Sequence, residues 1–372
     1  MKKIAIATQP SLKRTESRLG YGLLFDASVL DEMKRLGSRF ALFCDERIAA
    51  VIGKPWHAHL QKNGLDVTLL SFPAGEKEKS RERKAILEDR LLSEGFGRDT
   101  CIIALGGGVV TDLVGFLAST YCRGVPLILV PTTLLGMVDA AIGGKTGVNT
   151  QFGKNLIGTF YSADRIYIDP ETLSSLPPEE WTNGIAEVIK YALIHSPQLY
   201  QMLRNWNRAD AKQVEMIIHE CVLIKAQVVE MDFEEKLGLR RILNFGHTIA
   251  HAIETIENYQ LSHGEAVAIG MIVESFISVR MGYLTADALS EIEALIRSFP
   301  FSLKISRGVT REKMLSTLLL DKKSSRGAVR FVLLQKIGSC HPFNKEYCTT
   351  IPEKTLDEAL SWMFSLFSGE SR

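Results

Sequence analysis

The chain has 372 residues, of which 46% are hydrophobic and 23% are charged, and its formal net charge is +1. These values are ordinary for a globular enzyme of two domains, and they disfavour a protein that binds nucleic acid or a membrane surface. No apolar run approaches the ~20 residues that cross a bilayer, and the start lacks a signal-peptide core. Six cysteines without CxxC pairs fit a reducing compartment, so we expect a cytoplasmic protein.

The first part of the chain alternates short apolar strands with helices, which is the pattern of a parallel sheet covered on both faces. Ligands of such sheets bind beyond the carboxyl ends of the strands. The expected helices are residues 49–52, 80–94 and 111–121. The expected strands are residues 3–7, 39–44, 67–72, 100–105, 127–130 and 165–168.

After Asp169 the pattern becomes helical, and Pro177-Pro178 marks the entry to this part because such a pair cannot lie inside a helix. The sequence therefore predicts an α/β fold: a Rossmann-like parallel-sheet domain over residues 1–170, followed by a mainly α-helical domain over residues 171–372. An exposed basic loop followed by a hairpin or a strand at 330–334 is expected over 321–337. The expected helices are residues 179–194, 198–205, 209–229, 239–257, 265–280, 286–298 and 355–367.

Small residues follow two of the expected strands. Glycines 106–108 come after the strand at 100–105, where backbone N–H groups at a helix start can face a phosphate, although a tight turn would use the same glycines. Thr132 and Thr133 follow the next strand, and their hydroxyls suit either a ribose or phosphate or a helix cap. The GxGxxG fingerprint is absent, which disfavours a standard Rossmann dehydrogenase.

Cations gather in the segments that come next. The glycine-rich segment 139–155 holds Lys145 and Lys154, a combination of backbone donors and positive charge that binds anions. Arg123 adds a guanidinium suited to bidentate contact with phosphate. Each cation alone fits a solvated loop, but together they favour a phosphorylated ligand.

Glu187 and Lys190 lie three residues apart on an expected helix with apolar flanks, so they share a buried face. A buried Glu–Lys pair is costly if it serves stability alone, which favours a function, although a surface pair has the same spacing. Glu187 is therefore a candidate metal ligand.

Three of the eight histidines fall within residues 244–265. His247 and His251 are four apart on an expected helix and share a face, and His263 follows a short break. Neutral imidazoles at this spacing suit zinc, whereas one or two of them could simply form hydrogen bonds in a polar core. Helical spacing alone predicts that His247 and His251 form a metal-binding pair and that His263 comes back against this pair.

These segments resemble the 3-dehydroquinate synthase family of the shikimate pathway. The matching segments are GGGVVTDLVGF, RGVPLILVPTTLLGMVDAAIGGKTGVN, GKNLIGTFY, NGIAEVIKYALI, LRRILNFGHTIAHAIE and LSHGEAVAIGM, in the family's order from about residue 100 to 271. PAGEKEKS and DKKSSRGAVRFVLL agree more weakly. The matching segments are long and specific, which excludes a chance match.

The resemblance implies that the first domain binds NAD and that the second binds a divalent metal, Zn²⁺ or Co²⁺, and the substrate. The substrate would be 3-deoxy-D-arabino-heptulosonate 7-phosphate, and the products 3-dehydroquinate and phosphate, so the enzyme would be a carbon–oxygen lyase of chorismate and aromatic amino-acid biosynthesis. NAD would oxidise a secondary alcohol transiently, phosphate would be eliminated, the ketone would be reduced again, and an intramolecular aldol reaction would close the ring. The metal would act as a Lewis acid, and the substrate's own phosphate would take the proton.

The resemblance also implies roles for individual residues. Glu187, His247 and His263 would be the metal ligands, so His251 would instead face the substrate. Arg123 would reach the phosphate in the neighbouring subunit, which implies a homodimer. The other residues implied for substrate binding or catalysis are Asp139, Lys145, Asn155, Lys190, Lys225, Arg240, Asn244 and Lys322 or Lys323. NAD would be held by Asp45, Glu76, Lys79, Gly107, Gly108, Val109, Asp112, Thr132, Thr133, Asp139, Lys145, Lys154, Asn155, Thr172, Ser175 and Leu176.

The sequence departs from the family pattern at three places, one of which is Glu78 in PAGEKEKS, where an aromatic residue is common. Thr111 stands where glycine is usual, which adds a side chain near the cofactor diphosphate, and the loop 232–239 is one residue longer. Three other interpretations are a sugar-phosphate cyclase of the valiolone or deoxyinosose type, a metal-dependent alcohol or polyol dehydrogenase, and an inactive NAD-binding scaffold. The segment GGKTGVN, with Asn244 and His251, argues against another cyclase. The number of phosphate-binding cations argues against a dehydrogenase. The intact metal ligands and Lys190 argue against an inactive scaffold.

Overall fold

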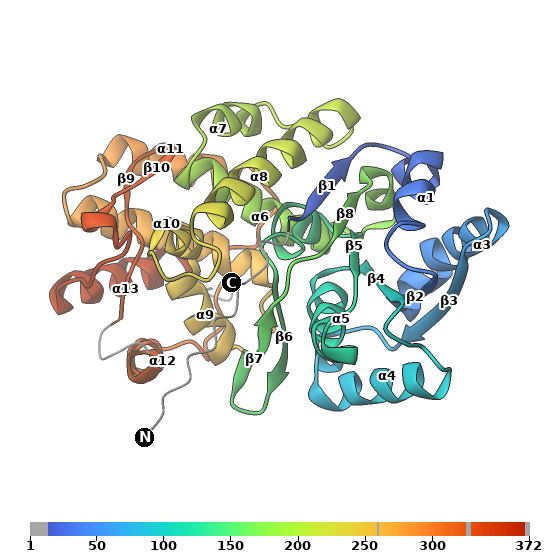
Figure 1. Ribbon diagram of the computed structural model, residues 1–372. Coiled ribbons are helices and arrows are strands. Elements are labelled where there is room, and N and C mark those ends of the chain that lie inside the picture. The colour runs from blue at the N-terminus through green and yellow to red at the C-terminus, as the bar shows by residue number, and fades with distance from the viewer. Residues whose placement is uncertain (1–13, 259, 325–328, 369–372) are drawn as a thin grey trace, which may run out of the picture. The chain divides into compact units, whose positions relative to one another are not determined.

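The computed structural model describes residues 14–258, 260–324 and 329–368, and Figure 1 labels their elements. They form two compact units. The sheet unit comprises the described residues up to Pro131 together with Gly144–Asp169, and the helical unit comprises Thr132–Gly143 together with the described residues from Pro170 onward. The segment Thr132–Gly143 thus packs with the helical unit although it lies before the predicted boundary at residue 170. That 1–170 and 171–372 fold as separate domains stays a prediction.

The sheet unit is built on six parallel strands in the order β1-β8-β5-β4-β2-β3, so the predicted parallel sheet is confirmed. Strand β4 is buried along its whole length, as expected for a strand covered on both faces. The strand order reverses between β2 and β4, and their carboxyl ends therefore flank the point at which such sheets bind ligands. The strands are β1 (Glu16–Leu19), β2 (Arg39–Asp45), β3 (Asp66–Phe72), β4 (Thr100–Gly106), β5 (Leu127–Pro131) and β8 (Arg165–Ile168).

Helices lie around these strands in Figure 1. The fully buried Trp56 fixes α3 to the unit, because its Nε1 donates to Leu24 O at 2.8 Å. A hairpin of β6 (Lys145–Thr150) and β7 (Gly153–Phe160) completes the unit. The helical elements are η1 (Leu23–Phe25), α1 (Ala27–Met33), α2 (Glu46–Ile48), η2 (Ala49–Gly53), α3 (Lys54–Lys62), η3 (Glu76–Glu78), α4 (Arg81–Ser93), α5 (Gly108–Thr120) and η4 (Tyr121–Arg123).

The helical unit confirms the predicted α-helical second part, and local sequence sets several of its helix ends. Pro178 occupies the first turn of α6, and Ser196 with Pro197 ends α6 and caps α7. Ser262 and Glu265 form a reciprocal cap at the start of α10. The elements are η5 (Gly136–Ala140), η6 (Pro170–Ser175), α6 (Pro178–Ile194), α7 (Pro197–Arg204), α8 (Ala211–Met231), η7 (Leu239–Asn244), α9 (His247–Ile256), α10 (His263–Arg280), α11 (Ala286–Arg297), α12 (Arg311–Ser324), β9 (Leu334–Lys336), β10 (Ser339–Cys340), η8 (Phe343–Lys345) and α13 (Glu353–Phe367).

Some sequence-based predictions are wrong. The single helix expected over 239–257 is interrupted at Gly246, whose φ of 82° breaks the helix before α9 begins. Part of the loop expected over 321–337 is the end of α12, and the expected hairpin or strand is the antiparallel pair β9–β10, somewhat later in the chain. The strand expected at 3–7 and residues 325–328 of that loop lie outside the described residues.

The hairpin β6–β7 was not among the predicted strands, although the glycine-rich segment 139–155 covers β6 and the start of β7. Its glycines are needed because the two strands approach closely: a Cβ on Gly158 would lie 1.9 Å from Thr146 O. Glycine therefore marks close backbone packing here rather than a loop. Within 14–258, 260–324 and 329–368, no helix combines the length and apolarity that crossing a membrane requires.

Candidate functional site

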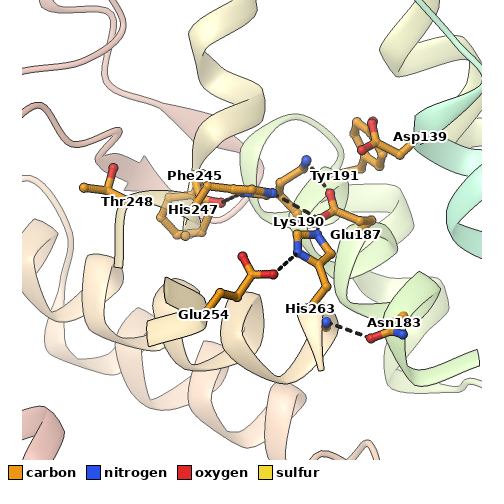
Figure 2. Close-up of polar contacts among 12 residues, drawn as sticks. Asp139, Asn183, Glu187, Lys190, Tyr191, Phe245, His247, Thr248, Glu254 and His263 are labelled. Atoms are coloured by element: carbon orange, nitrogen blue, oxygen red, sulfur yellow. Dashed lines mark hydrogen bonds and ion pairs between the residues drawn. The ribbon is translucent and has the colours of Figure 1, made fainter. Parts of the chain in front are cut away.

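Three side chains of the helical unit converge on a candidate metal centre. Glu187 comes from α6, His247 from the first turn of α9, and His263 from the first turn of α10. The Nε2 atoms of both histidines lie 3.3 Å from Glu187 Oε1, and the three candidate ligand atoms all lie within 4.8 Å of one another. Figure 2 shows both imidazoles directed at the carboxylate.

Glu187 is 0% exposed and forms an ion pair with Lys190 on the same helix, so the surface-pair alternative is wrong. Burial alone would raise the pKa of Glu187, but Lys190 and His247 hold it well below its ordinary value. The carboxylate is therefore ionised, which is the form that binds a cation.

The two imidazoles are oriented through their second nitrogens. His247 Nδ1 lies 3.1 Å from Phe245 O, and His263 Nδ1 lies 3.4 Å from Glu254 Oε1 (Figure 2). Burial alone would lower the pKa of His263, but hydrogen bonds to Glu187 and Glu254 raise it to about 10. A metal bound here would displace that proton, since imidazole ligates in its neutral form.

The donor set fits a catalytic zinc ion. Two imidazole nitrogens and an ionised carboxylate oxygen are ligands that zinc prefers, and three protein ligands leave a position for water or substrate. The ring of His251 lies 5.4 Å from that of His247, centre to centre, and His251 is exposed. His251 is outside the group of three, which supports the set implied by the family resemblance over the His247–His251 pair suggested by helical spacing.

A second buried polar cluster surrounds Asp139, which lies in η5. Lys225 from α8 forms an ion pair with the Asp139 carboxylate and donates to Asp139 O at 2.5 Å. Tyr191 from α6 donates its hydroxyl hydrogen to Asp139 Oδ1 at 2.6 Å. Burial alone would raise the pKa of Asp139, but Lys225 and Lys190 hold it well below its ordinary value. The cluster keeps two ammonium groups and one carboxylate ready for a polar ligand.

Tyr191→Phe should lower the free energy of unfolding by about 1.5–3 kcal/mol, because it removes a hydrogen bond to a buried charged group. Urea unfolding of the metal-free protein measures this change. Tyr200→Phe is the matched control, since the Tyr200 hydroxyl lies 3.4 Å from Glu291 O and from Glu291 Oε2 and forms only weak contacts. An equal loss in both variants would mean that the Asp139 contact has no special weight.

The remaining predicted substrate residues of the helical unit lie in two elements, η7 and α12. Arg240 in η7 is buried, and its guanidinium donates to Gly143 O at 3.0 Å. Asn244 ends η7 and is exposed. Lys322 and Lys323 lie in α12.

In the sheet unit, the predicted NAD residues gather at carboxyl ends of strands. Asp45 ends β2, and Glu76 and Lys79 follow β3. Lys79 forms an ion pair with Asp112 of α5 at 2.5 Å. Gly107, Gly108 and Val109 form the N-terminus of α5, where N–H groups face outward from the helix.

Residues around β6 and β7 extend this group. Asn149 donates from Nδ2 to Glu76 Oε1 at 2.7 Å, and its Oδ1 accepts from Asn155 N at 3.1 Å. Lys145 begins β6, and Lys154 lies in β7. Thr111 is buried and donates to Gly108 O at 3.1 Å, so its hydroxyl is directed to the backbone of its own helix.

The two threonines after β5 differ in their contacts. Thr133 Oγ1 accepts from Gly136 N at 3.0 Å, which is the capping contact. The Thr132 hydroxyl is buried and has no hydrogen-bond partner among the described residues, as expected for a group that meets a ligand. Thr172 and Ser175 lie in η6, and Leu176 follows it.

Arg123 lies in a strained turn of the sheet unit. Cys122, Arg123 and Gly124 have φ angles of 50°, 71° and 109°, and left-handed backbone is unfavourable for the first two. The Arg123 side chain is exposed. Strain at an exposed guanidinium is consistent with a functional role.

Sequence analysis missed the roles of Tyr191, Glu254, Asn149 and Asn183. Asn183 Oδ1 accepts from Gly264 N at 2.9 Å and so joins α6 to the start of α10 (Figure 2). Tyr191 and Asn183 flank the Glu187–Lys190 pair in sequence, and their polarity on an apolar helix was the signal available. Nothing in the sequence pairs Asn149 with Glu76.

Two family models match the chain: the 3-dehydroquinate synthase N-terminal model over residues 69–183 and the 3-dehydroquinate synthase C-terminal model over residues 184–324. A curated 3-dehydroquinate synthase from Pelobacter propionicus is 42% identical over 331 residues, which cover 86% of this chain and 92% of the relative. Another from Nitrosomonas europaea is 37% identical over 365 residues, 96% of each chain.

Solved structures of similar fold include two sugar cyclases. A 2-epi-5-epi-valiolone synthase from Streptomyces hygroscopicus subsp. jinggangensis, with NAD⁺ and Zn²⁺ bound, is 26% identical with a TM-score of 0.84 over 98% of this chain and 99% of that one. A 2-deoxy-scyllo-inosose synthase complexed with carbaglucose-6-phosphate, NAD⁺ and Co²⁺ is 27% identical with a TM-score of 0.79 over 92% and 95%. A glycerol dehydrogenase from Schizosaccharomyces pombe, 16% identical with a TM-score of 0.66 over 94% and 88%, shares the fold alone.

Proposed function

The chain belongs to the 3-dehydroquinate synthase family, and we propose that it converts 3-deoxy-D-arabino-heptulosonate 7-phosphate to 3-dehydroquinate and phosphate. This reaction would make it a carbon–oxygen lyase of the shikimate pathway. The observation that carries the proposal is the convergence of Glu187, His247 and His263 beside the buried Lys190 in a chain of this family. Two cyclases of related fold with NAD⁺ and a divalent metal bound add support.

Glu187, His247 and His263 are the residues proposed to hold Zn²⁺ or Co²⁺. When bound, the metal supplies a Lewis acid that polarises a substrate oxygen, and NAD supplies a hydride acceptor. The N-terminus of α5, which has no side-chain cap among the described residues, supports the proposed NAD binding, because such a helix start can face a phosphate. The proposed NAD-binding residues are Asp45, Glu76, Lys79, Gly107, Gly108, Val109, Asp112, Thr132, Thr133, Asp139, Lys145, Lys154, Asn155, Thr172, Ser175 and Leu176.

The chain's own residues bind and orient the substrate. The ammonium groups of Lys190 and Lys225 pair with buried carboxylates, which hold both side chains in place. Both can then act as charged partners of a polar substrate. Tyr191 and Lys225 together fix the Asp139 carboxylate, which can accept hydrogen bonds from substrate hydroxyls. His251 lies exposed beside His247, where its ring nitrogens can hold or release a proton.

Phosphate binding is assigned to cations that do not ligate the metal. These are Lys145, Arg240, Lys322 or Lys323, and Arg123 from a second subunit, with Asn155 and Asn244 as neutral partners. The substrate would carry a phosphate that leaves in the reaction, and several cations around it would stabilise the charge that develops on it. A cytoplasmic location is proposed as well, supported by six cysteines that form no disulfide.

Purified protein given the heptulosonate phosphate with catalytic NAD and zinc should release phosphate, and a phosphate assay follows this directly. NADH that accumulates one-for-one with substrate, without phosphate, would indicate a polyol dehydrogenase. Turnover of a different sugar phosphate in place of this one would indicate another sugar-phosphate cyclase.

For the proposed homodimer, mixing Arg123→Ala with His251→Ala subunits should restore activity that neither variant has alone. Random exchange gives hybrid dimers with one intact site each, so about a quarter of the wild-type rate is expected. Phosphate release after verified subunit exchange measures this. Absence of recovery would mean that Arg123 serves its own subunit.

A further inference from the structure

The N-terminus of α9, which carries His247, has no side-chain cap of its own. Gly246 stands at the N-cap position with φ 82° and offers no side-chain acceptor to the first N–H groups of the helix. The acceptor comes instead from α10. Glu274 Oε2 accepts from Gly246 N at 2.8 Å, and Oε1 accepts from Thr248 N at 3.2 Å and from Ile249 N at 3.4 Å.

Close contact between α9 and α10 makes this reach possible. A Cβ on Gly270 would lie 1.9 Å from Gly246 O, and a Cβ on Gly246 would lie 2.7 Å from Met271 Cγ. Glycine at both positions lets the two backbones touch. Glu274 lies four residues after Gly270, so its side chain is on the face of α10 that contacts α9 and reaches the start of α9.

Glu274 is 0% exposed, and among the described residues no lysine, arginine or histidine forms an ion pair with it. Burial raises the pKa of Glu274 to about 8, and its three N–H partners oppose that shift. The N-terminus of α9 is thus the partner of this carboxyl group, through three hydrogen bonds and the helix dipole. A carboxyl group buried in this way is costly if it serves stability alone.

We propose that Glu274 is a positioning residue that holds His247 in its metal-binding place before the metal arrives. His247 is flanked by two of the three N–H donors, and it is the first residue of α9 as His263 is the first residue of α10. The carboxyl group therefore ties the start of α9, which carries His247, to the interior of α10, the helix that begins with His263. This inference rests on the proposed metal site, and a preorganised site binds more tightly because less ordering accompanies binding.

The first test is amide hydrogen exchange on the metal-free wild-type protein, read from peptides that cover residues 245–251. If Glu274 holds the turn, the amides of Gly246, Thr248 and Ile249 are protected without zinc, and added zinc changes their exchange little. Protection that appears only when zinc is added would overturn the proposal, because the metal would then order the turn.

The second test compares zinc affinity, measured by competition with a chromogenic chelator, between Glu274→Gln and Ser278→Ala. The glutamine amide has one acceptor oxygen instead of two, and we expect at least about a tenfold loss of zinc affinity. Ser278 is the matched control. Its hydroxyl donates to Glu274 O at 2.7 Å and accepts from Leu334 N at 3.0 Å, so Ser278→Ala removes buried hydrogen bonds from the same helix without changing α9.

Each outcome separates this inference from the function on which it rests. If the wild type binds zinc and Glu274→Gln binds it with the same affinity, the positioning role is overturned and the metal site remains. The same holds if Ser278→Ala loses as much zinc affinity as Glu274→Gln. A wild-type chain that binds no zinc would overturn the metal site itself, and the inference with it. If Glu274→Gln does not fold, hydrogen exchange in the wild-type protein decides.

Discussion

His247→Ala should abolish zinc binding and, with it, phosphate release. The side chain supplies one of three ligand atoms that lie within 4.8 Å of one another, and the other two ligands alone form a much weaker site. The loss of zinc affinity should exceed the roughly 10–100-fold that follows when a group that merely supports a ligand is removed. Zinc per subunit after dialysis and chelator competition measure it, independently of activity.

His251→Ala is the matched control, because His251 lies one helical turn away with its ring 5.4 Å from that of His247. Its zinc affinity should stay close to that of the wild type. Its rate should fall about 10²-fold or more, as expected when a proton-transferring group is lost. Equal loss of zinc in the two variants would show that the pair suggested by helical spacing is the correct ligand set after all.

Lys190→Met should destabilise the metal-free protein by about 3–5 kcal/mol, because it leaves the fully buried carboxylate of Glu187 without its principal cation. With zinc bound the loss should be smaller, since the metal's charge then compensates the same carboxylate. Urea unfolding with and without zinc gives both values.

Lys236→Met serves as the control for this experiment. Lys236 also pairs with a glutamate, Glu234, but both side chains are exposed, and such pairs contribute about 0–1 kcal/mol. If Lys190→Met is equally destabilising with and without zinc, the metal does not compensate Glu187, which argues against Glu187 as a ligand.

Much of the sheet unit could be predicted from the sequence. Strands β2, β3, β4, β5 and β8 are apolar runs bounded by turn residues, and their periodicity identifies them directly. Strand β1 is polar at the edge of the sheet, and β6 and β7 contain the glycines that their close pairing requires, so composition concealed all three. Gly246 likewise lies inside an otherwise helical pattern, and only its left-handed backbone shows that α9 starts there.

The residue types of the candidate site can be identified from the amino-acid sequence, and its long motifs indicate the family. Glu187 with Lys190 on one helix face and three histidines in a short segment already indicate metal chemistry. Which atoms meet depends on how the helices pack. His263 joins His247 and Glu187 because α10 packs against both α9 and α6, which helical spacing cannot express. Asp139 is far from Tyr191 in the sequence, and Glu274 is far from the start of α9. These groups come into contact because they are buried together, and no local sequence pattern indicates it.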